Sequence, residues 1–166
     1  MLQIKFHKLF YFYKCFFIAF ILYIFPKNCL SLTFEPMESK IKYELEFPIN
    51  SSPALLYQYI STPSGLSEWF ADNVNSRGEF FTFIWNDSEE KARMTSKKSG
   101  EKIKFRWIDE DANDTDYYFE LRILEDEITK DVSLMVIDYA HEDEVEEASL
   151  LWENQISDLK HVIGSV

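Results

Sequence analysis

Residues 52–70 read SPALLYQYISTPSGLSEWF and hold two helix-start signals in quick succession. Ser52 followed by Pro53, and Thr62 followed by Pro63, each place a hydroxyl N-cap before a proline at the first helical position. The stretch therefore predicts two short helices in tandem. Apolar residues recur at helical spacing after each signal: Leu55, Leu56, Tyr59 and Ile60 after the first, and Leu66, Trp69 and Phe70 after the second.

Strands are predicted on both sides of this helical stretch. Before it, residues 40–47 alternate between apolar and charged side chains, which is typical of a half-buried strand, and Pro48 is expected to end that strand. Consecutive apolar-rich segments joined by short polar turns follow it and predict an antiparallel meander. These further strands are expected at 78–85, 91–95, 102–108, 117–123 and 132–140.

The last part of the chain predicts one long amphipathic helix. Its apolar residues recur at three- and four-residue steps from Val145 to Ile163, which gives roughly 19 residues and a length of about 28 Å. Acidic residues fill the first turn and His161 lies in the last, as the helix dipole favours. Gly164 is expected to end the helix.

Residues 37–166 are strongly acidic, with 13 basic and 28 acidic residues and a net charge of −15. A surface of that sign repels phosphate backbones and anionic lipid headgroups. We therefore expect neither nucleic-acid binding nor membrane binding by this part of the chain. A basic protein partner is the kind of partner that such a charge favours.

Residues 1–36 differ from the rest, because they hold 11 of the 28 aromatic residues and only five charged ones. Three interpretations stay open. Lysines ahead of an apolar run at 15–25 are typical of a signal peptide, with Cys29 and Ser31 at its cleavage site. The segment is alternatively a membrane anchor, or it is translated from upstream of a true start at Met37. In each case we expect 1–36 to be a non-domain leader and 37–166 to be one domain.

Both cysteines, Cys15 and Cys29, lie in the leader. The domain therefore has no disulfide, thiol nucleophile or cysteine metal site. This composition suits a reducing compartment, so we expect a cytoplasmic protein. A genuine signal peptide or anchor in residues 1–36 would make it exported or membrane-anchored instead.

The order of predicted elements resembles the START-like (SRPBCC) superfamily. Its helix-grip fold is shared by START domains, the birch-pollen allergen family and the activator of the ninety-kilodalton heat-shock chaperone. The chaperone-activator-like branch is the nearest match, carried by LYQYISTP at 56–63, LSEWF at 66–70 and Gly78-Glu79-Phe80. The resemblance implies an α+β fold, with two short helices after the first strand and a curved antiparallel sheet of about seven strands around the C-terminal helix. It implies an apolar cavity but no shared catalytic set.

Inward-facing residues of the sheet and the terminal helix are the candidate lining of that cavity. Apolar walls with a few polar groups suit a hydrophobic ligand, lipid-like or aromatic, and no cofactor is expected. The alternative is that the same side chains simply fill the core. The eight candidates are Phe83, Trp85, Phe105, Trp107, Tyr117, Phe119, Trp152 and Ile156.

No catalytic residue and no metal site is expected. Residues 109–120 carry oxygen ligands at several positions of an EF-hand calcium loop. However, Asp114 stands where that loop needs glycine and strands flank the segment, so we expect a solvated acidic hairpin loop. His141 follows Asp138, a pair that a hydrolase could use as base and orienting acid, but we expect His141 at the surface.

Three functions stay open at this point. The first is a non-enzymatic module that holds a lipid-like or aromatic molecule in its cavity. The second is a protein-interaction module, similar to a co-chaperone, that docks a basic partner on its acidic surface. The third is a hydrolase or cyclase that uses the same pocket.

If translation starts at Met37, a chain lacking residues 1–36 is expected to be soluble and to unfold cooperatively, because the domain's whole pattern lies downstream. Thermal unfolding followed by circular dichroism checks this. Peptide mapping of the protein from its own host is the second measurement. A peptide containing Cys15 or Cys29 in the mature protein would contradict the proposed start.

Overall fold

The computed structural model describes residues 40–86, 88–109 and 114–165, so the leader and the centre of the acidic loop lie outside the described residues. Three short segments precede the meander, namely β1 (Ile41–Ile49), α2 (Pro53–Ser61) and α3 (Pro63–Leu66). A single turn of 3-10 helix (Glu142–Glu144) and α4 (Val145–Val162) follow it. The meander consists of β2 (Asn73–Arg77), β3 (Phe80–Trp85), β4 (Ser88–Lys98), β5 (Lys102–Ile108), β6 (Asp114–Glu125) and β7 (Val132–Ala140).

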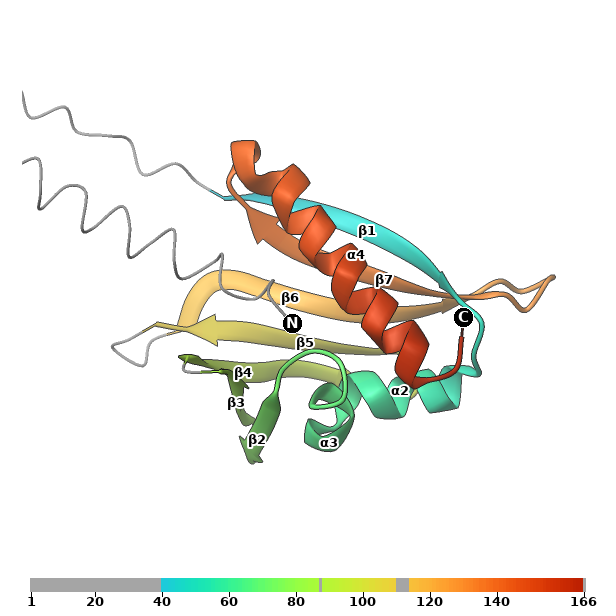
Figure 1. Cartoon of the computed structure of the whole chain (residues 1–166), viewed down its shortest axis with the longest axis horizontal. Helices are drawn as coiled ribbons and strands as arrows, with labels where there is room; N and C mark the ends of the chain where they lie inside the picture. The colour runs from blue at the N-terminus through green and yellow to red at the C-terminus, as the bar shows by residue number, and fades with distance from the viewer. Residues whose placement is uncertain (1–39, 87, 110–113, 166) are drawn as a thin grey trace, which may run out of the picture. The chain divides into compact units, whose positions relative to one another are not determined.

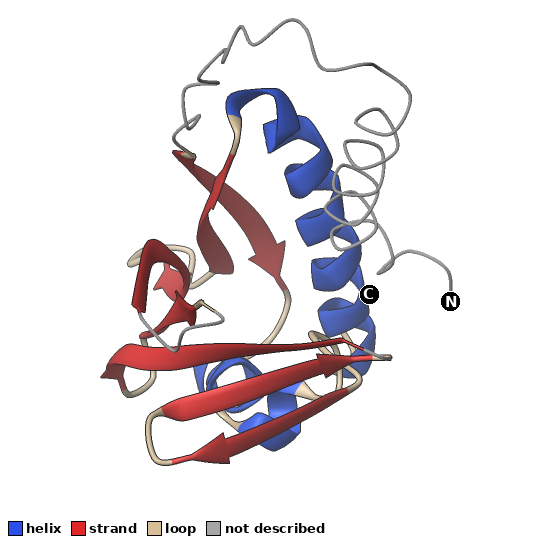
Figure 2. Cartoon of the chain, turned by 90° about the vertical axis from the view of Figure 1, so that its left-hand side faces the viewer, coloured by secondary structure: helices blue, strands red, loops and turns tan. Residues whose placement is uncertain are grey.

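The seven strands form one antiparallel sheet in the order β1-β7-β6-β5-β4-β3-β2. The first strand pairs with the last, from Ile41 opposite Ala140 to Ile49 opposite Val132. Helices α2 and α3 therefore carry the chain from one edge of the sheet, β1, to the other edge, β2 (Figure 1). The strands bend around α4, which lies against the concave side of the sheet (Figure 2). The predicted helix-grip fold is confirmed.

The two helix-start signals work as predicted. The Ser52 hydroxyl accepts a hydrogen bond from the backbone N–H of Leu55 at 3.2 Å. The Thr62 hydroxyl accepts one from the N–H of Gly65 at 3.0 Å and donates one to the carbonyl of Gln58 at 2.8 Å. Thr62 therefore caps α3 and holds it against the end of α2 at the same time.

Strand boundaries differ from prediction at several places, since β3 begins two residues later than expected and β4 and β6 extend beyond the expected 91–95 and 117–123 at both ends. Strand β1 continues through Pro48 to Ile49, with Pro48 opposite Ser133. A proline is tolerated there because β1 is an edge strand that pairs on one side only. Strand β2 was not predicted, because Val74 is its one buried residue and its sequence does not alternate. Hydrogen-bonded pairing with β3 is what makes this segment a strand.

The terminal helix agrees with the sequence pattern. Helix α4 spans 18 residues and buries Trp152, Ile156 and Leu159. It is followed by Gly164 with a φ of +71°, a left-handed conformation that glycine adopts without strain. The core lies between this helix, the concave face of the sheet and the short helices, which contribute Leu56, Ile60 and Leu66.

A glycine determines how closely the two short helices approach. A Cβ atom at Gly65 would lie 2.5 Å from the Gln58 carbonyl oxygen and 2.6 Å from the Tyr59 Cα atom. Both are backbone atoms, so no change of rotamer relieves the overlap. We expect Gly65→Ala to lower the free energy of unfolding by about 2–3 kcal/mol, measured by urea denaturation.

The matched control is Ser64→Ala. Ser64 is the exposed neighbour of Gly65 on the same helix. Its replacement is expected to change the free energy of unfolding by no more than about 0.5 kcal/mol. Equal losses in the two variants would contradict the close approach of α3 to α2.

Candidate functional site

A cluster of aromatic rings fills the concave side of the sheet beneath α4. Phe70, in the segment that follows α3, is one of the rings that join its parts. Its ring centroid lies 5.2–5.7 Å from those of five others, which are Trp69, Phe83, Trp85, Phe119 and Trp152. The cluster therefore joins the short helical segment, the middle of the sheet and α4. Phe70 was predicted as an apolar residue of the second short helix and was not among the eight candidate lining residues.

The eight candidate lining residues fall into two groups by burial. Five are buried almost completely: Phe83, Phe105, Phe119, Trp152 and Ile156. The other three, Trp85, Trp107 and Tyr117, are half-buried. The half-buried rings are the part of the predicted lining that stays partly accessible.

The structure brings most of these candidates together. The ring of Trp107 lies 5.8 Å from that of Phe83 and 5.1 Å from that of Phe119, and Phe119 lies 6.1 Å from Trp152. Trp85 stacks on Phe83 at 5.9 Å, and Phe105 stacks on Phe119 at 5.0 Å. These spacings are those of rings in direct contact.

Two candidates lie apart from this cluster. The ring neighbour of Tyr117 is Tyr139, at 5.6 Å. Ile156 lines a shallow groove of about 340 Å³ between β1 and α4, together with Phe47, Glu153, Ser157 and Lys160. Most of the predicted lining thus belongs to the aromatic cluster, whereas Ile156 belongs to a separate groove of mixed polar and apolar lining.

A polar group borders the aromatic cluster. The indole N–H of Trp152 donates a hydrogen bond to the Asp138 carboxylate at 2.9 Å, and the Tyr43 hydroxyl donates to the same oxygen at 3.5 Å. Burial, and after it the negative charge of Asp138, raises the pKa of Tyr43 well above its usual range. Tyr43 therefore stays protonated and acts as a donor at this position.

Tyr43 was not predicted at the site, and Asp138 was considered only as an orienting acid for His141 and not as part of a binding wall. One signal was present, since Asp138 interrupts the otherwise apolar inward positions of strand 132–140. Its partners Tyr43 and Trp152 lie far away in the sequence, so no spacing rule points to them. The sheet pairs Tyr43 with Asp138 across β1 and β7.

His141 is half-buried and so is less exposed than the sequence analysis expected. Its Nδ1 atom is buried and has no hydrogen-bond partner among the described residues. The side-chain hydrogen bonds just given for Asp138 come from Trp152 and Tyr43. The acid–base pair that a hydrolase would need is thus not among these contacts.

Two further findings apply to residues 40–86, 88–109 and 114–165 alone. Within them, no group of three or more His, Cys, Asp or Glu side chains is placed to hold a metal ion. No helix in this part of the chain is both long enough and apolar enough to cross a bilayer. Within the predicted acidic loop at 109–120, residues 110–113 lie outside the described residues, whereas 114–120 belong to strand β6.

The arrangement of sheet, short helices and terminal helix has a known counterpart. Residues 37–165 match the START-like superfamily domain. The chain belongs to this family. Among solved structures, a Bacteroides fragilis protein determined by solution NMR is 35% identical, covering 75% of this chain and 91% of that one, with a TM-score of 0.55.

More distant START-like neighbours share the fold. The Aha1 dimer of Colwellia psychrerythraea is 14% identical, covering 74% of this chain and 96% of that one, with a TM-score of 0.61. CalU16 of Micromonospora echinospora is also 14% identical, covering 76% and 77%, with a TM-score of 0.57. No protein with a curated function matches the chain significantly. At this identity, the likeness of these two neighbours extends to the fold alone.

Replacing Trp152 tests the packing of the START-like core. The side chain is 5% exposed, contacts Phe70 and Phe119, and donates to Asp138. We expect Trp152→Ala to lower the free energy of unfolding by about 3–5 kcal/mol, because it leaves a large cavity. Chemical denaturation followed by circular dichroism measures the loss.

Glu153→Ala, one position along α4, is the control. Glu153 is exposed, so its replacement is expected to cost no more than about 0.5 kcal/mol. If Trp152 faces a ligand-sized space instead of packed core, its loss costs much less than a buried tryptophan should. Comparable destabilisation by the two variants would mean that the buried face of α4 is assigned wrongly.

Proposed function

We propose that this START-like domain is a non-enzymatic module that binds a hydrophobic small molecule on the concave side of its sheet, beneath α4. The observation that carries the proposal is the combination of an aromatic wall with one polar group. Trp107 is half-buried within the aromatic cluster, and the Asp138–Tyr43–Trp152 group borders the same wall. Binding sites for small molecules typically pair apolar walls with a few polar atoms that orient the ligand.

The chemistry of this wall narrows the class of ligand. Indole and phenyl rings offer flat faces, which suit an aromatic ring or a lipid-like chain. The Asp138 carboxylate accepts hydrogen bonds, so a ligand hydroxyl or amine is the group that it would orient. We therefore propose a mainly apolar molecule with one hydrogen-bond donor.

The contacts around Asp138 support binding over catalysis. Its neighbours Trp152 and Tyr43 are donors held in place by burial, and the raised pKa of Tyr43 makes it a poor base at neutral pH. His141, the candidate base, has a buried Nδ1 without a partner among the described residues. A positioned polar group without a base suits a binding site. A cytoplasmic location is part of the same proposal, because both cysteines lie in residues 1–36 and the domain is compatible with a reducing compartment.

The test is native mass spectrometry of the full chain, purified from its own host without denaturation. We expect an additional mass from one bound organic molecule that organic solvent extracts. In parallel, the neutral apolar dye Nile red is expected to bind with saturation. Trp107→Ala removes a half-buried ring from the wall and is expected to change the dye's dissociation constant at least about threefold.

Ile128→Ala is the matched control for the dye experiment. Ile128 lies in the turn between β6 and β7 and is 91% exposed, so it tests adsorption to apolar surface. We expect its replacement to leave dye binding unchanged. An unliganded native mass, together with dye binding that does not saturate or that both variants alter equally, would mean that side chains fill the proposed pocket.

A further inference from the structure

The outer face of the sheet, which points away from α4, carries most of the domain's positive charge. On β4, β5 and β6 the buried residues, such as Ala92, Phe105 and Leu121, face the core, so their neighbours in sequence face outward. Seven of the 13 basic residues in 37–166 occupy these outward positions: Lys91, Arg93, Lys98, Lys102, Lys104, Arg106 and Arg122. More than half of the basic residues of this acidic domain are therefore gathered on one face of three strands.

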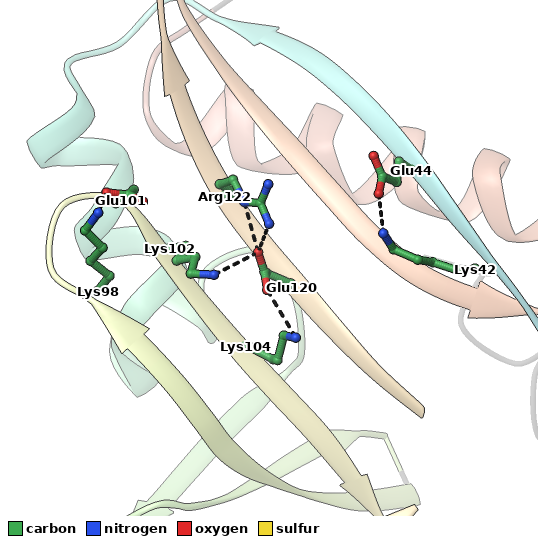
Figure 3. A network of polar contacts seen from close by, with 8 residues as sticks. All are labelled: Lys42, Glu44, Lys98, Glu101, Lys102, Lys104, Glu120 and Arg122. Atoms are coloured by element: carbon green, nitrogen blue, oxygen red, sulfur yellow. Dashed lines mark hydrogen bonds and ion pairs between the residues drawn. The ribbon is translucent and has the colours of Figure 1, made fainter. Parts of the chain in front are cut away.

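At the centre of this face, three cations share a single carboxylate. The ammonium nitrogens of Lys102 and Lys104 lie 3.5 and 3.4 Å from the two oxygens of Glu120, and the Arg122 Nε donates to it at 3.0 Å (Figure 3). The Glu120 side chain is 2% exposed, whereas those of Lys102, Lys104 and Arg122 are 25–38% exposed. We call these four residues the Glu120 cluster.

The Glu120 cluster has an excess of positive charge. One buried carboxylate holds three cations, so the cluster carries a net charge of +2 toward solvent. Burial alone would raise the pKa of Glu120, but Arg122, Lys102 and Lys104 together hold it below its usual range. Glu120 therefore stays ionised and holds the three cations in place. Its single negative charge neutralises only one of their three positive charges.

Like charges also lie directly opposite each other on this face. Arg93 is the cross-strand partner of Arg106, and Lys102 is the partner of Arg122. Directly opposed like charges destabilise a sheet unless other groups balance them. Glu120 lies between Lys102 and Arg122 and balances this second pair in part.

Aromatic side chains lie within the same face. Phe80, the cross-strand partner of Arg93, is 56% exposed. The ring of Tyr118 lies beneath the Lys104 ammonium group at 3.7 Å and meets the Tyr139 ring at 5.0 Å. The face thus offers apolar contact surface beside its cations.

We propose that the outer face of β4, β5 and β6 is a docking surface for a short acidic segment of another protein, one in which acidic residues alternate with apolar ones. Carboxylates of that segment would pair with Lys102, Lys104 and Arg122 around Glu120. Its apolar side chains would contact Tyr118 and Phe80.

The outer face of β4, β5 and β6 is small, which favours a short protein segment over a larger polyanion as its partner. Three strands about 4.8 Å apart span roughly 10 Å, and the outward residues from Lys102 to Arg106 cover about 13 Å along β5. Acidic residues border the face, including Glu44 and Glu46 on β1, and on the face itself Glu89 pairs with Lys91 at the start of β4. Screening acts over about 8 Å at physiological salt, so a short segment senses the cations, whereas a membrane or nucleic acid also meets the acidic surroundings.

The experiment uses the full chain and a short fluorescein-labelled peptide in which glutamate alternates with leucine. Fluorescence anisotropy measures the binding of this peptide to the chain. We expect saturable binding that weakens as salt is raised. Lys102→Glu combined with Lys104→Glu is expected to raise the dissociation constant at least about tenfold. Because the double reversal places new carboxylates beside Glu120, Lys102→Gln with Lys104→Gln serves as a milder second variant, and circular dichroism checks that both fold.

The control is Lys130→Glu combined with Lys160→Glu, which changes the net charge equally outside this face. We expect it to leave peptide binding within about twofold of the wild type. Equal weakening by the control would overturn the proposal, because binding would then follow net charge alone. The proposal would also be overturned if single-stranded DNA or phosphatidylserine vesicles bound and the peptide did not. It would likewise be overturned if the chain self-associated and the Lys102 and Lys104 variants abolished that self-association.

Discussion

The close approach of α3 to α2 at Gly65 is the constraint on which the rest of this structure depends. The two helices must carry the chain from β1, at one edge of the sheet, to β2, at the other. With no side chain at position 65, α3 packs directly on the backbone of Gln58 and Tyr59, and Thr62 joins the two helices by hydrogen bonds. The residues that follow α3 then bring Phe70 into the middle of the concave face. From there, Phe70 contacts Phe119 of the sheet and Trp152 of α4. The short helices, the sheet and α4 are therefore joined through this one residue.

The two faces of the sheet have opposite characters because side chains alternate along each strand. Inward positions of the central strands are aromatic and pack beneath α4, whereas outward positions collect lysine and arginine around the single buried carboxylate of Glu120. One sheet therefore has an apolar inner face, proposed to bind a small molecule, and a charged outer face, proposed to dock an acidic segment. The two surfaces belong to the same strands but share no side chain, so substitutions on one face are expected to leave the other intact.

Membership of the START-like family establishes the architecture and leaves the chemistry to individual side chains. The aromatic cluster is compatible with both a filled core and a ligand wall, because rings 5–6 Å apart pack equally well in either. Our proposal of a ligand wall rests on the polar group formed by Tyr43, Asp138 and Trp152. A carboxylate placed at the border of an apolar core costs desolvation energy, and that cost is easier to understand where a ligand uses the carboxylate.

Local patterns in the sequence were sufficient to predict the helix caps at Ser52 and Thr62, the alternating strands, the terminal helix and its end at Gly164. Each of these depends on residues within a few positions of one another. The extension of β1 through Pro48 and the existence of β2 required the pairing of strands, since neither segment has a pattern of its own. The meeting of Tyr43 with Asp138, the excess of cations around Glu120 and the segregation of charge between the two faces were likewise decided only by the tertiary structure. A net charge of −15 over residues 37–166 indicated basic partners, yet net charge carries no information about position, and the register of β4, β5 and β6 is what gathers the positive charges on one face.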